Sequence, residues 1–223
     1  MEPILRGILE FQQRVYPEHR ELFQELHSGQ SPKTMLITCS DSRIDPALIM
    51  GTKPGDIFIV RNAGNIVAPA DQPCGSEPAS VEYALKVLGI EDLIVCGHTQ
   101  CGAMTALLNP ESLDGLECVH AWVANAEASV KRARQRATGT SPQELLDACI
   151  ESNVILQLEH LQTYPFVAER LQDGRLRLHG MVYHFEKGRM DYYEAATNRF
   201  VPLAETNAQH GVTAAATGAE VTG

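Results

Sequence analysis

Three runs of mainly apolar residues in the first half of the chain are typical of buried strands. They cover residues 34–39, 57–60 and 93–96. Apolar residues do not alternate with polar ones in these runs, as is usual for parallel strands that are covered on both faces. A helical pattern at 78–88, closed by Gly89, separates the second run from the third. This order predicts an α/β fold with a mostly parallel, doubly wound central sheet flanked by helices.

The two ends of the chain have different patterns. Apolar residues near the N-terminus recur at helical spacing in two stretches separated by a Tyr-Pro pair, and a Ser-Gly pair ends the second stretch. We therefore expect an N-terminal amphipathic helical arm at 1–30, which lies on its own domain or on a partner subunit. An α/β domain is expected at 31–203. The small and polar residues at 204–223 predict a mobile C-terminal tail.

The second half of the chain carries further helix and strand signals. A long helix is expected around 119–130, and the capping-box sequence at 141–144 opens another helix that runs to Leu161. Residues 176–185 and 190–193 are expected to form a C-terminal strand hairpin around a Lys-Gly turn.

Composition and charge narrow the classes of function. The formal net charge of −10, with a single short basic run at 131–136, argues against nucleic acid as a partner. No apolar run approaches the roughly 18 residues of a membrane span, and the N-terminus lacks a basic start followed by an apolar stretch. We therefore expect a cytoplasmic protein without membrane contact. Six cysteines in 223 residues are too few for a disulfide framework, so some are expected to be metal ligands and the others small core residues.

Cysteine and histidine side chains lie where two of the expected strands end. Cys39 closes the first run, and His98 and Cys101 follow the third. Ligands of open α/β sheets bind beyond the carboxyl ends of the strands, so these side chains are expected to meet. Two thiolates and one imidazole, with a fourth position left open, are the pattern of a catalytic zinc site. Cys96 is a competing ligand, but its place inside an apolar run favours a buried thiol.

An acidic and a basic residue follow Cys39 at alternate positions, as Asp41 and Arg43. On an extended path the Asp41 side chain points to the same side as Cys39 and reaches the metal or its water. Arg43 is expected to hold the carboxylate of Asp41 through two hydrogen bonds. The pair could then switch between accepting a hydrogen bond from a metal ligand and a closed, inactive arrangement in which Asp41 ligates the zinc directly.

Four motifs together resemble those of the β-class carbonic anhydrases. They are Cys-Ser-Asp-Ser-Arg at 39–43, Arg-Asn-Ala-Gly-Asn at 61–65, Glu-Tyr-Ala at 82–84 and Gly-His-Thr-Gln-Cys-Gly at 97–102. The similarity covers nearly the whole chain from Gln30 to about Tyr193. The two zinc motifs in this order are highly specific for the family.

The resemblance implies that the protein catalyses the reversible hydration of carbon dioxide to bicarbonate and a proton. One Zn²⁺ per subunit would be bound by Cys39, His98 and Cys101, with water or hydroxide in the fourth position. Asp41 and Arg43 would form the catalytic dyad, in which Asp41 takes a hydrogen bond from the metal-bound hydroxide.

The same resemblance implies a small apolar pocket for CO₂. Members of the plant-like type line this pocket with a glutamine, a phenylalanine and a tyrosine, which Gln30, Phe58 and Tyr83 match, and Gly102 is assigned to the pocket as well. The glutamine comes from the neighbouring subunit in that type. The N-terminal helices are therefore expected to be dimer arms, and the active form a homodimer or a higher homo-oligomer.

A few positions bear on the type of site. A second type in the family has a tryptophan three residues before the first zinc cysteine, as part of an inhibitory bicarbonate site. Leu36 stands there, which favours the open type, although Arg61 and Tyr183 match other positions of the inhibitory site. Pro78 replaces a glycine that is usual in the family. It suits the first turn of a helix, or it shifts the backbone near Tyr83.

Two other functions stay open on the same fold. Relatives in the family hydrolyse carbon disulfide or carbonyl sulfide, which are linear molecules similar in shape to CO₂. The chain could also be a catalytically silent zinc-binding homologue, but a purely structural zinc site has no need of an Asp41–Arg43 pair.

Overall fold

The computed structural model describes residues 1–137, 139 and 141–203. The expected tail at 204–223 lies outside the described residues. The chain divides into two compact units, Met1–Ser31 and a larger one that begins at Pro32. Each unit is described by itself.

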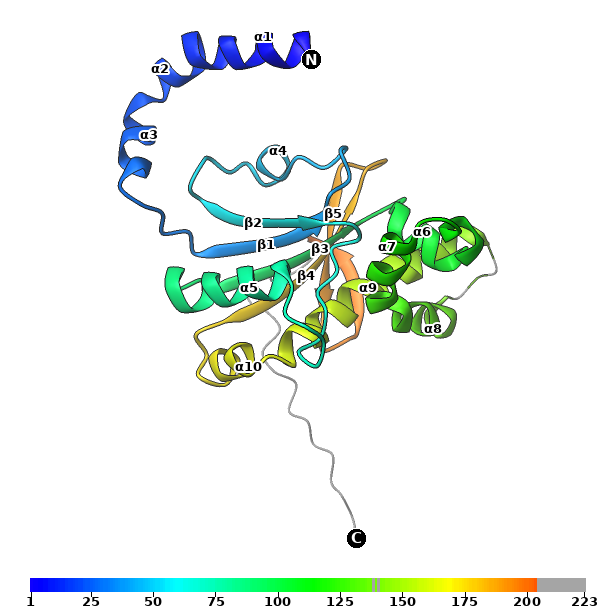
Figure 1. The fold of residues 1–223 in the computed structure, drawn as a ribbon. Helices are drawn as coiled ribbons and strands as arrows, with labels where there is room; N and C mark the ends of the chain where they lie inside the picture. Colours follow the sequence, from blue (N-terminus) through cyan, green and yellow to red (C-terminus); the bar gives the residue numbers. More distant parts are fainter. Residues whose placement is uncertain (138, 140, 204–223) are drawn as a thin grey trace. The chain divides into compact units, whose positions relative to one another are not determined.

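The larger unit is built on a six-stranded sheet with the order β2-β1-β3-β4-β5-β6 (Figure 1). Its strands are β1 (Thr34–Cys39), β2 (Ile57–Asn62), β3 (Asp92–His98), β4 (Arg177–His184), β5 (Arg189–Glu194) and β6 (Arg199–Pro202). Strands β2, β1, β3 and β4 pair in parallel, whereas β5 and β6 pair antiparallel. The mostly parallel sheet and the C-terminal hairpin are confirmed, and β6 extends the hairpin by a strand that the sequence analysis did not predict.

The order of the strands reverses at β1. The chain passes from β1 to β2 on one side and then returns to β3 on the other side of β1. The carboxyl ends of β1 and β3 therefore flank the switch point of the sheet, where ligands of doubly wound folds bind.

Seven α-helices of the described part flank the sheet (Figure 1). They are α4 (Pro46–Met50), α5 (Ser76–Tyr83), α6 (Gly102–Leu108), α7 (Glu117–Val123), α8 (Glu127–Arg136), α9 (Pro142–Gln162) and α10 (Pro165–Gln172). The helix expected at 78–88 is found as α5 with a π-helical turn, Ala84–Leu88, and Gly89 ends it with a left-handed φ of 69°. Pro78 lies in the first turn of α5, where the backbone needs no N–H donor.

The single long helix expected around 119–130 is wrong. The segment forms α7 and α8, which are separated by a 3₁₀ turn, Ala124–Ala126. The side chain of Asn125 donates a hydrogen bond to the carbonyl oxygen of Trp122 at 3.0 Å. Such local side-chain bonds compete with the regular helical pattern, and apolar spacing does not reveal them.

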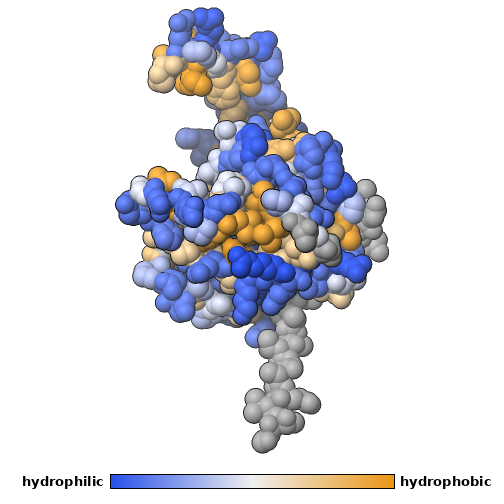
Figure 2. Space-filling view, turned by 90° about the vertical axis from the view of Figure 1, so that its right-hand side faces the viewer, coloured by the Kyte–Doolittle hydropathy of each residue, from blue (hydrophilic) through white to orange (hydrophobic). Residues whose placement is uncertain are grey.

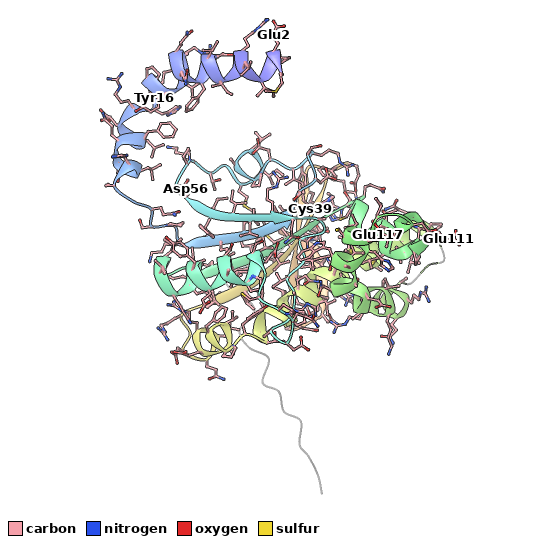
Figure 3. All side chains as sticks on the ribbon, in the orientation of Figure 1. Glu2, Tyr16, Cys39, Asp56, Glu111 and Glu117 are labelled. Carbon is pink, nitrogen blue, oxygen red and sulfur yellow. The ribbon has the colours of Figure 1, made fainter. Side chains whose placement is uncertain are left out.

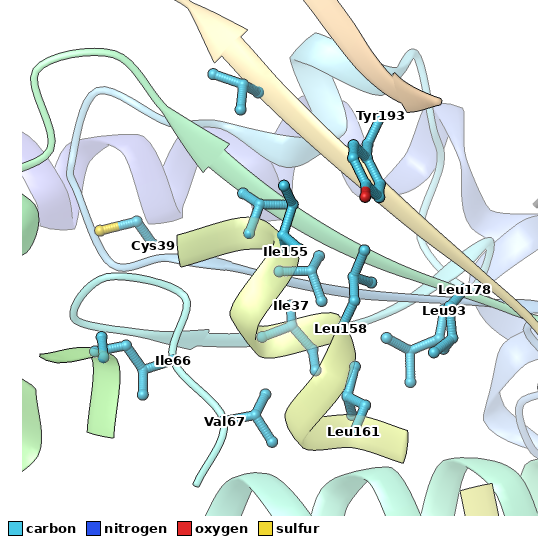
Figure 4. Packing of buried hydrophobic residues seen from close by; sticks show 14 of the residues in the cluster. Ile37, Cys39, Ile66, Val67, Leu93, Ile155, Leu158, Leu161, Leu178 and Tyr193 are labelled. Carbon is cyan, nitrogen blue, oxygen red and sulfur yellow. The ribbon is translucent and has the colours of Figure 1, made fainter. Parts of the chain in front are cut away.

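Helix α9 covers one face of the sheet and supplies much of the core. It begins with the predicted capping box, because the Ser141 hydroxyl accepts from the Glu144 amide at 3.2 Å and the Glu144 carboxylate accepts from the Ser141 amide at 3.1 Å. Its apolar side chains pack against residues of β1, β3 and β4 (Figure 4). A Cβ atom at Gly97 would lie 2.9 Å from Val154 of this helix, so the close approach of α9 requires glycine just before His98.

The Met1–Ser31 unit consists of α1 (Glu2–Glu10), a π-helical turn (Phe11–Val15), α2 (Tyr16–Glu18) and α3 (Arg20–His27). The helical path continues through Pro17 and breaks at His19, where φ is −113°. No side chain of these helical segments is buried within the described structure. Ile4, Leu5 and Leu9 are more than half exposed, which leaves an amphipathic unit with an uncovered apolar face.

A groove with a volume of about 790 Å³ lies between α6 and α8 of the larger unit. Leu107, Leu108, Pro110 and Val130 supply its apolar lining. Figure 2 shows apolar side chains gathered on the face that carries these helices. Within the described residues, no helix is both long and apolar enough to cross a membrane.

Candidate metal centre

The three residues expected to bind zinc lie together. The ligand atoms of Cys39, His98 and Cys101 all lie within 4.8 Å of one another, and all three residues are buried. Cys39 ends β1, His98 ends β3, and Cys101 is the residue before α6. Figure 3 labels Cys39 where β1 ends. The cluster therefore lies at the switch point of the sheet, beyond the carboxyl ends of the strands, as the sequence predicted.

A tight turn after β3 brings Cys101 back toward His98. Gln100 at the centre of this turn has a left-handed φ of 56°, which is uncommon for a residue other than glycine. Its carbonyl oxygen accepts a hydrogen bond from an Arg43 Nη atom at 3.1 Å. The strained backbone at Gln100 is therefore held by a residue that follows the other strand of the site.

The imidazole of His98 is oriented for metal binding. Its Nδ1 atom lies 2.9 Å from the carbonyl oxygen of Thr99, so this nitrogen carries the proton and donates. Its Nε2 atom is buried and has no hydrogen-bond partner among the described residues. A buried nitrogen with a free lone pair is costly unless a ligand takes it.

Each of the two thiols changes the pKa of the other. The neighbouring Cys101 side chain, and then the His98 side chain and the Gly64 amide, lower the pKa of the Cys39 thiol against the effect of burial. The pKa of the Cys101 thiol is raised by its neighbour Cys39 and by burial. In the absence of a metal one thiol therefore loses its proton before the other, and only a cation favours two thiolates side by side. Two sulfurs and the unpartnered imidazole nitrogen fit the ligand preference of Zn²⁺.

The loop after β2 is hydrogen-bonded to the sulfur of Cys39. The amide of Gly64 donates to Cys39 Sγ at 3.3 Å. Asn153 of α9 donates to the Gly64 carbonyl at 2.9 Å, and Gln157 of α9 accepts from the Val67 amide at 2.9 Å. Both α9 side chains are fully buried, and the sequence analysis missed them. The available signal was that these two amide side chains stand among apolar residues in the middle of α9, because buried polar groups need partners.

Asp41 and Arg43 form the expected ion pair. Arg43 donates to both carboxylate oxygens, from Nε to Oδ1 at 2.9 Å and from an Nη atom to Oδ2 at 2.7 Å. The Arg43 amide also donates to Oδ1 at 2.9 Å. The Arg43 side chain and then its amide hold the pKa of Asp41 well below its usual range. Asp41 is therefore ionised and accepts hydrogen bonds only.

Arg61 fixes the backbone on which this pair stands. Its guanidinium donates to the carbonyl oxygens of Cys39 at 3.0 Å and Asp41 at 2.8 Å. These bonds join β2 to the end of β1 and to the loop that follows it, so Arg61 stabilises the backbone at the end of β1. Leu36, which stands where the inhibitory type has tryptophan, is almost fully buried in β1.

Phe185 contacts both halves of the site, although it belongs to none of the sequence motifs. The centroid of its ring lies 4.5 Å from the Cζ atom of Arg43 and 5.3 Å from the centroid of the His98 imidazole. Phe185 directly follows β4 and lies far from both motifs in the sequence. No local pattern marks such a contact.

The residues assigned to the CO₂ pocket lie on different elements. The rings of Phe58 on β2 and Tyr83 on α5 have centroids 6.2 Å apart. Gly102 begins α6, directly after Cys101. Gln30 belongs to the N-terminal unit, and its place in the pocket stays a prediction. Cys96 is the expected buried thiol, because burial raises its pKa to about 12 and it lies outside the cluster of ligand atoms.

Comparisons with known proteins agree with this arrangement. A family model described as carbonic anhydrase matches residues 34–190. A carbonic anhydrase of Pseudomonas aeruginosa is 46% identical over 207 residues, which are 92% of this chain and 93% of the relative. The solved structure of the β-carbonic anhydrase CcaA is 39% identical, with a TM-score of 0.87 over 91% of each chain. A tetrameric β-carbonic anhydrase from Sordaria macrospora is 26% identical, with a TM-score of 0.77 over 86% of this chain and 95% of that one. Sequence, fold and ligand cluster together show that the chain belongs to the β-carbonic anhydrase family of enzymes.

Proposed function

We propose that the protein catalyses the reversible hydration of carbon dioxide to bicarbonate and a proton, with one Zn²⁺ per subunit. The observation that carries this proposal is the convergence of three buried ligand atoms beside an ionised Asp–Arg pair. Cys39, His98 and Cys101 would hold the metal. When bound, Zn²⁺ would act as a Lewis acid and lower the pKa of a water molecule at the coordination position that the protein leaves open.

Asp41 would orient the reacting water. Because its carboxylate stays ionised and has no proton to donate, it accepts a hydrogen bond from the water and leaves a lone pair of that water free for the carbon of CO₂. The lowered pKa also makes Asp41 a poor proton acceptor, so the proton leaves by another route. Arg43 would keep the carboxylate in one orientation through its two hydrogen bonds.

The pocket residues would hold CO₂ through apolar contact. CO₂ is small, linear and uncharged, so rings such as those of Phe58 and Tyr83 suit it better than a charged lining. We propose that Gln30 of a neighbouring subunit and Gly102 complete this pocket.

A homodimer or higher homo-oligomer is the proposed active form. Support comes from the uncovered apolar face of α1, where Ile4 is 63% and Ile8 is 48% exposed. The groove between α6 and α8, which apolar and charged residues line together, is a second exposed surface. The similar enzyme of Sordaria macrospora is described as tetrameric. A cytoplasmic location and the dimerising role of the arm stay predictions.

A comparison of substrates tests the reaction. We expect the zinc-loaded protein to turn over CO₂ much faster than carbonyl sulfide or carbon disulfide. All three molecules are linear and could be attacked by the same water, so only a direct comparison of their turnover rates distinguishes the two reactions. A strong preference for either sulfur compound would overturn the proposal in favour of a hydrolase on the same fold. No turnover of any of the three, with zinc bound, would favour the silent homologue.

A further inference from the structure

We propose that Phe185 is a positioning residue of the active site, which holds the Arg43 guanidinium in the orientation that pairs it with Asp41. This inference rests on the proposed roles of Asp41 and Arg43. It adds a residue that acts on the reaction through Arg43 and touches no reacting atom.

The guanidinium of Arg43 has three fixed neighbours. Its edge donates to both carboxylate oxygens of Asp41, and one Nη atom also donates to the Gln100 carbonyl. Its Cζ atom lies over the ring of Phe185, 4.5 Å from the centroid. A cation at this distance is attracted by the electron-rich face of an aromatic ring. The ring therefore adds a third contact to the two hydrogen-bonding partners of the guanidinium.

The contact matters because the Arg43 side chain is 51% exposed. A half-exposed arginine has many rotamers available in water and loses side-chain entropy when it is held in one. The Phe185 ring occupies space that these alternative rotamers would use. Removal of the ring would therefore lower the fraction of molecules in which both Asp41 oxygens are held.

Phe185 is itself anchored to the strand that carries His98. Its amide donates to the Thr99 hydroxyl at 3.1 Å, and that hydroxyl donates to the Glu186 carboxylate at 3.0 Å. Thr99 is only 5% exposed. The ring of Tyr183 packs edge-on against Phe185, with centroids 5.2 Å apart. The position of the ring is thus set from the end of β3, so it couples Arg43 to the strand that bears the metal ligand.

The ring also meets the His98 imidazole edge-on, with centroids 5.3 Å apart and an interplanar angle of 66°. A change at Phe185 could therefore act through His98 instead. The two routes have different consequences. An effect through His98 changes metal binding, whereas an effect through Arg43 leaves the metal in place and depends on the presence of Arg43.

The test compares Phe185→Leu, Phe185→Tyr and a control in the zinc-loaded protein. Leucine keeps apolar bulk without the ring face, and tyrosine keeps the face. Phe166→Leu is the matched control. The ring of Phe166 on α10 lies 5.3 Å from Nζ of Lys86, which belongs to the π-helical turn after α5, away from the three metal ligands in the fold. Zinc content, kcat and KM for CO₂ are measured for each variant and for Phe185→Leu in an Arg43→Ala background. Crystal structures of the wild type and Phe185→Leu show the Arg43–Asp41 pair directly.

We expect Phe185→Leu to lower kcat by about three- to tenfold with unchanged KM and full zinc content, in line with the strength of a cation–π contact. Phe185→Tyr retains most of the wild-type rate, and Phe166→Leu matches the wild type. In the Arg43→Ala background Phe185→Leu causes no further loss. The crystal structure of Phe185→Leu shows Arg43 displaced from one or both Asp41 oxygens.

Three results would overturn the inference. They are loss of zinc in Phe185→Leu, an equal loss of kcat with and without Arg43, and an unchanged Arg43–Asp41 pair in the variant crystal. If the wild type does not hydrate CO₂ the proposed function fails, and the crystal structures still decide whether Phe185 positions Arg43.

Discussion

Arg43 holds both carboxylate oxygens of Asp41, at 2.9 and 2.7 Å, and does so two residues further along the same loop. The short separation leaves the pair little freedom, because the Arg43 amide binds one of the same oxygens. Cys39 stands two residues before Asp41, so one short segment of backbone carries a proposed metal ligand and the carboxylate proposed to orient the water. The proposed chemistry depends on this arrangement.

Replacement of Asp41 by Asn tests the orienting role. We expect kcat for CO₂ hydration to fall by about ten- to a hundredfold, because the amide offers the reacting water a donor as well as an acceptor and loses the charge that holds Arg43. Zinc content is expected to stay at the wild-type level. Asp56→Asn is the control, since the Asp56 carboxylate only accepts from the Lys53 amide in an exposed turn. Wild-type turnover in Asp41→Asn would remove the role assigned to the dyad.

Metal analysis of variants tests which cysteines bind the metal. We expect Cys101→Ser to lower bound zinc well below one ion per chain and to abolish turnover, because the serine hydroxyl is not deprotonated as the thiol is. Cys96→Ala is the control, since Cys96 is buried beside the Met190 sulfur and outside the cluster. Equal zinc loss in both variants would mean that the cluster does not define the metal site.

The sequence alone predicts the framework of this site because its signals are local. The apolar runs of β1 and β3 identify neighbouring buried strands, and the ligands follow at their ends. Local sequence patterns do not identify residues that reach the site through contacts between distant parts of the chain. Phe185 reaches Arg43 only through the pairing of β3 with β4, and Asn153 reaches Gly64 only through the packing of α9. The break between α7 and α8 coincides with a hydrogen bond from the Asn125 side chain to the Trp122 carbonyl, which apolar spacing cannot reveal.

The buried amide network of α9 is expected to stabilise the fold. Asn153→Leu removes the donor to the Gly64 carbonyl and the acceptor for Gln157. We expect the free energy of unfolding to fall by about 1–3 kcal/mol, the usual cost of unpaired buried polar groups. Gln162→Ala, at the C-terminal end of the same helix, is the control, because this amide is only partly buried and donates to the Leu158 carbonyl. Urea unfolding of the zinc-loaded proteins measures the difference, and a stability equal to that of the wild type would contradict the supporting role of the network.

An ion pair at the start of β3 predicts a pH dependence of stability. Arg177 and His179 hold the pKa of Asp92 below its ordinary value of 3.8, and these contacts outweigh the effect of burial. A carboxylate with a depressed pKa stabilises the fold above its unfolded pKa and loses this effect as the pH falls through its folded pKa. Asp92→Asn is therefore expected to be less stable than the wild type near neutral pH.

The difference between Asp92→Asn and the wild type should shrink as the pH drops below about 4. Thermal unfolding is measured for both proteins without metal, so that release of the metal in acid does not contribute to the difference in stability. A gap in stability that stays constant from neutral to acidic pH would show that the variant acts through packing and not through charge.

The apolar face of α1 is expected to form a subunit contact. Ile8→Glu places a charge on this face, and we expect it to shift the protein toward monomers in sedimentation experiments and to lower CO₂ turnover with it. Gln12→Glu is the control, because it adds the same charge at an exposed polar position of the adjoining turn. An unchanged oligomeric state in Ile8→Glu would exclude this face from the interface.

Stopped-flow CO₂ hydration by the wild type, with and without its metal, tests the central claim most directly. The account predicts fast turnover by the zinc-loaded protein that rises with pH across about 7 to 9, the range in which a water on a thiolate-ligated zinc is expected to lose its proton. Turnover should vanish when the metal is removed and return when zinc is restored. A protein with one zinc per chain and no CO₂ hydration at any pH in this range would contradict the account.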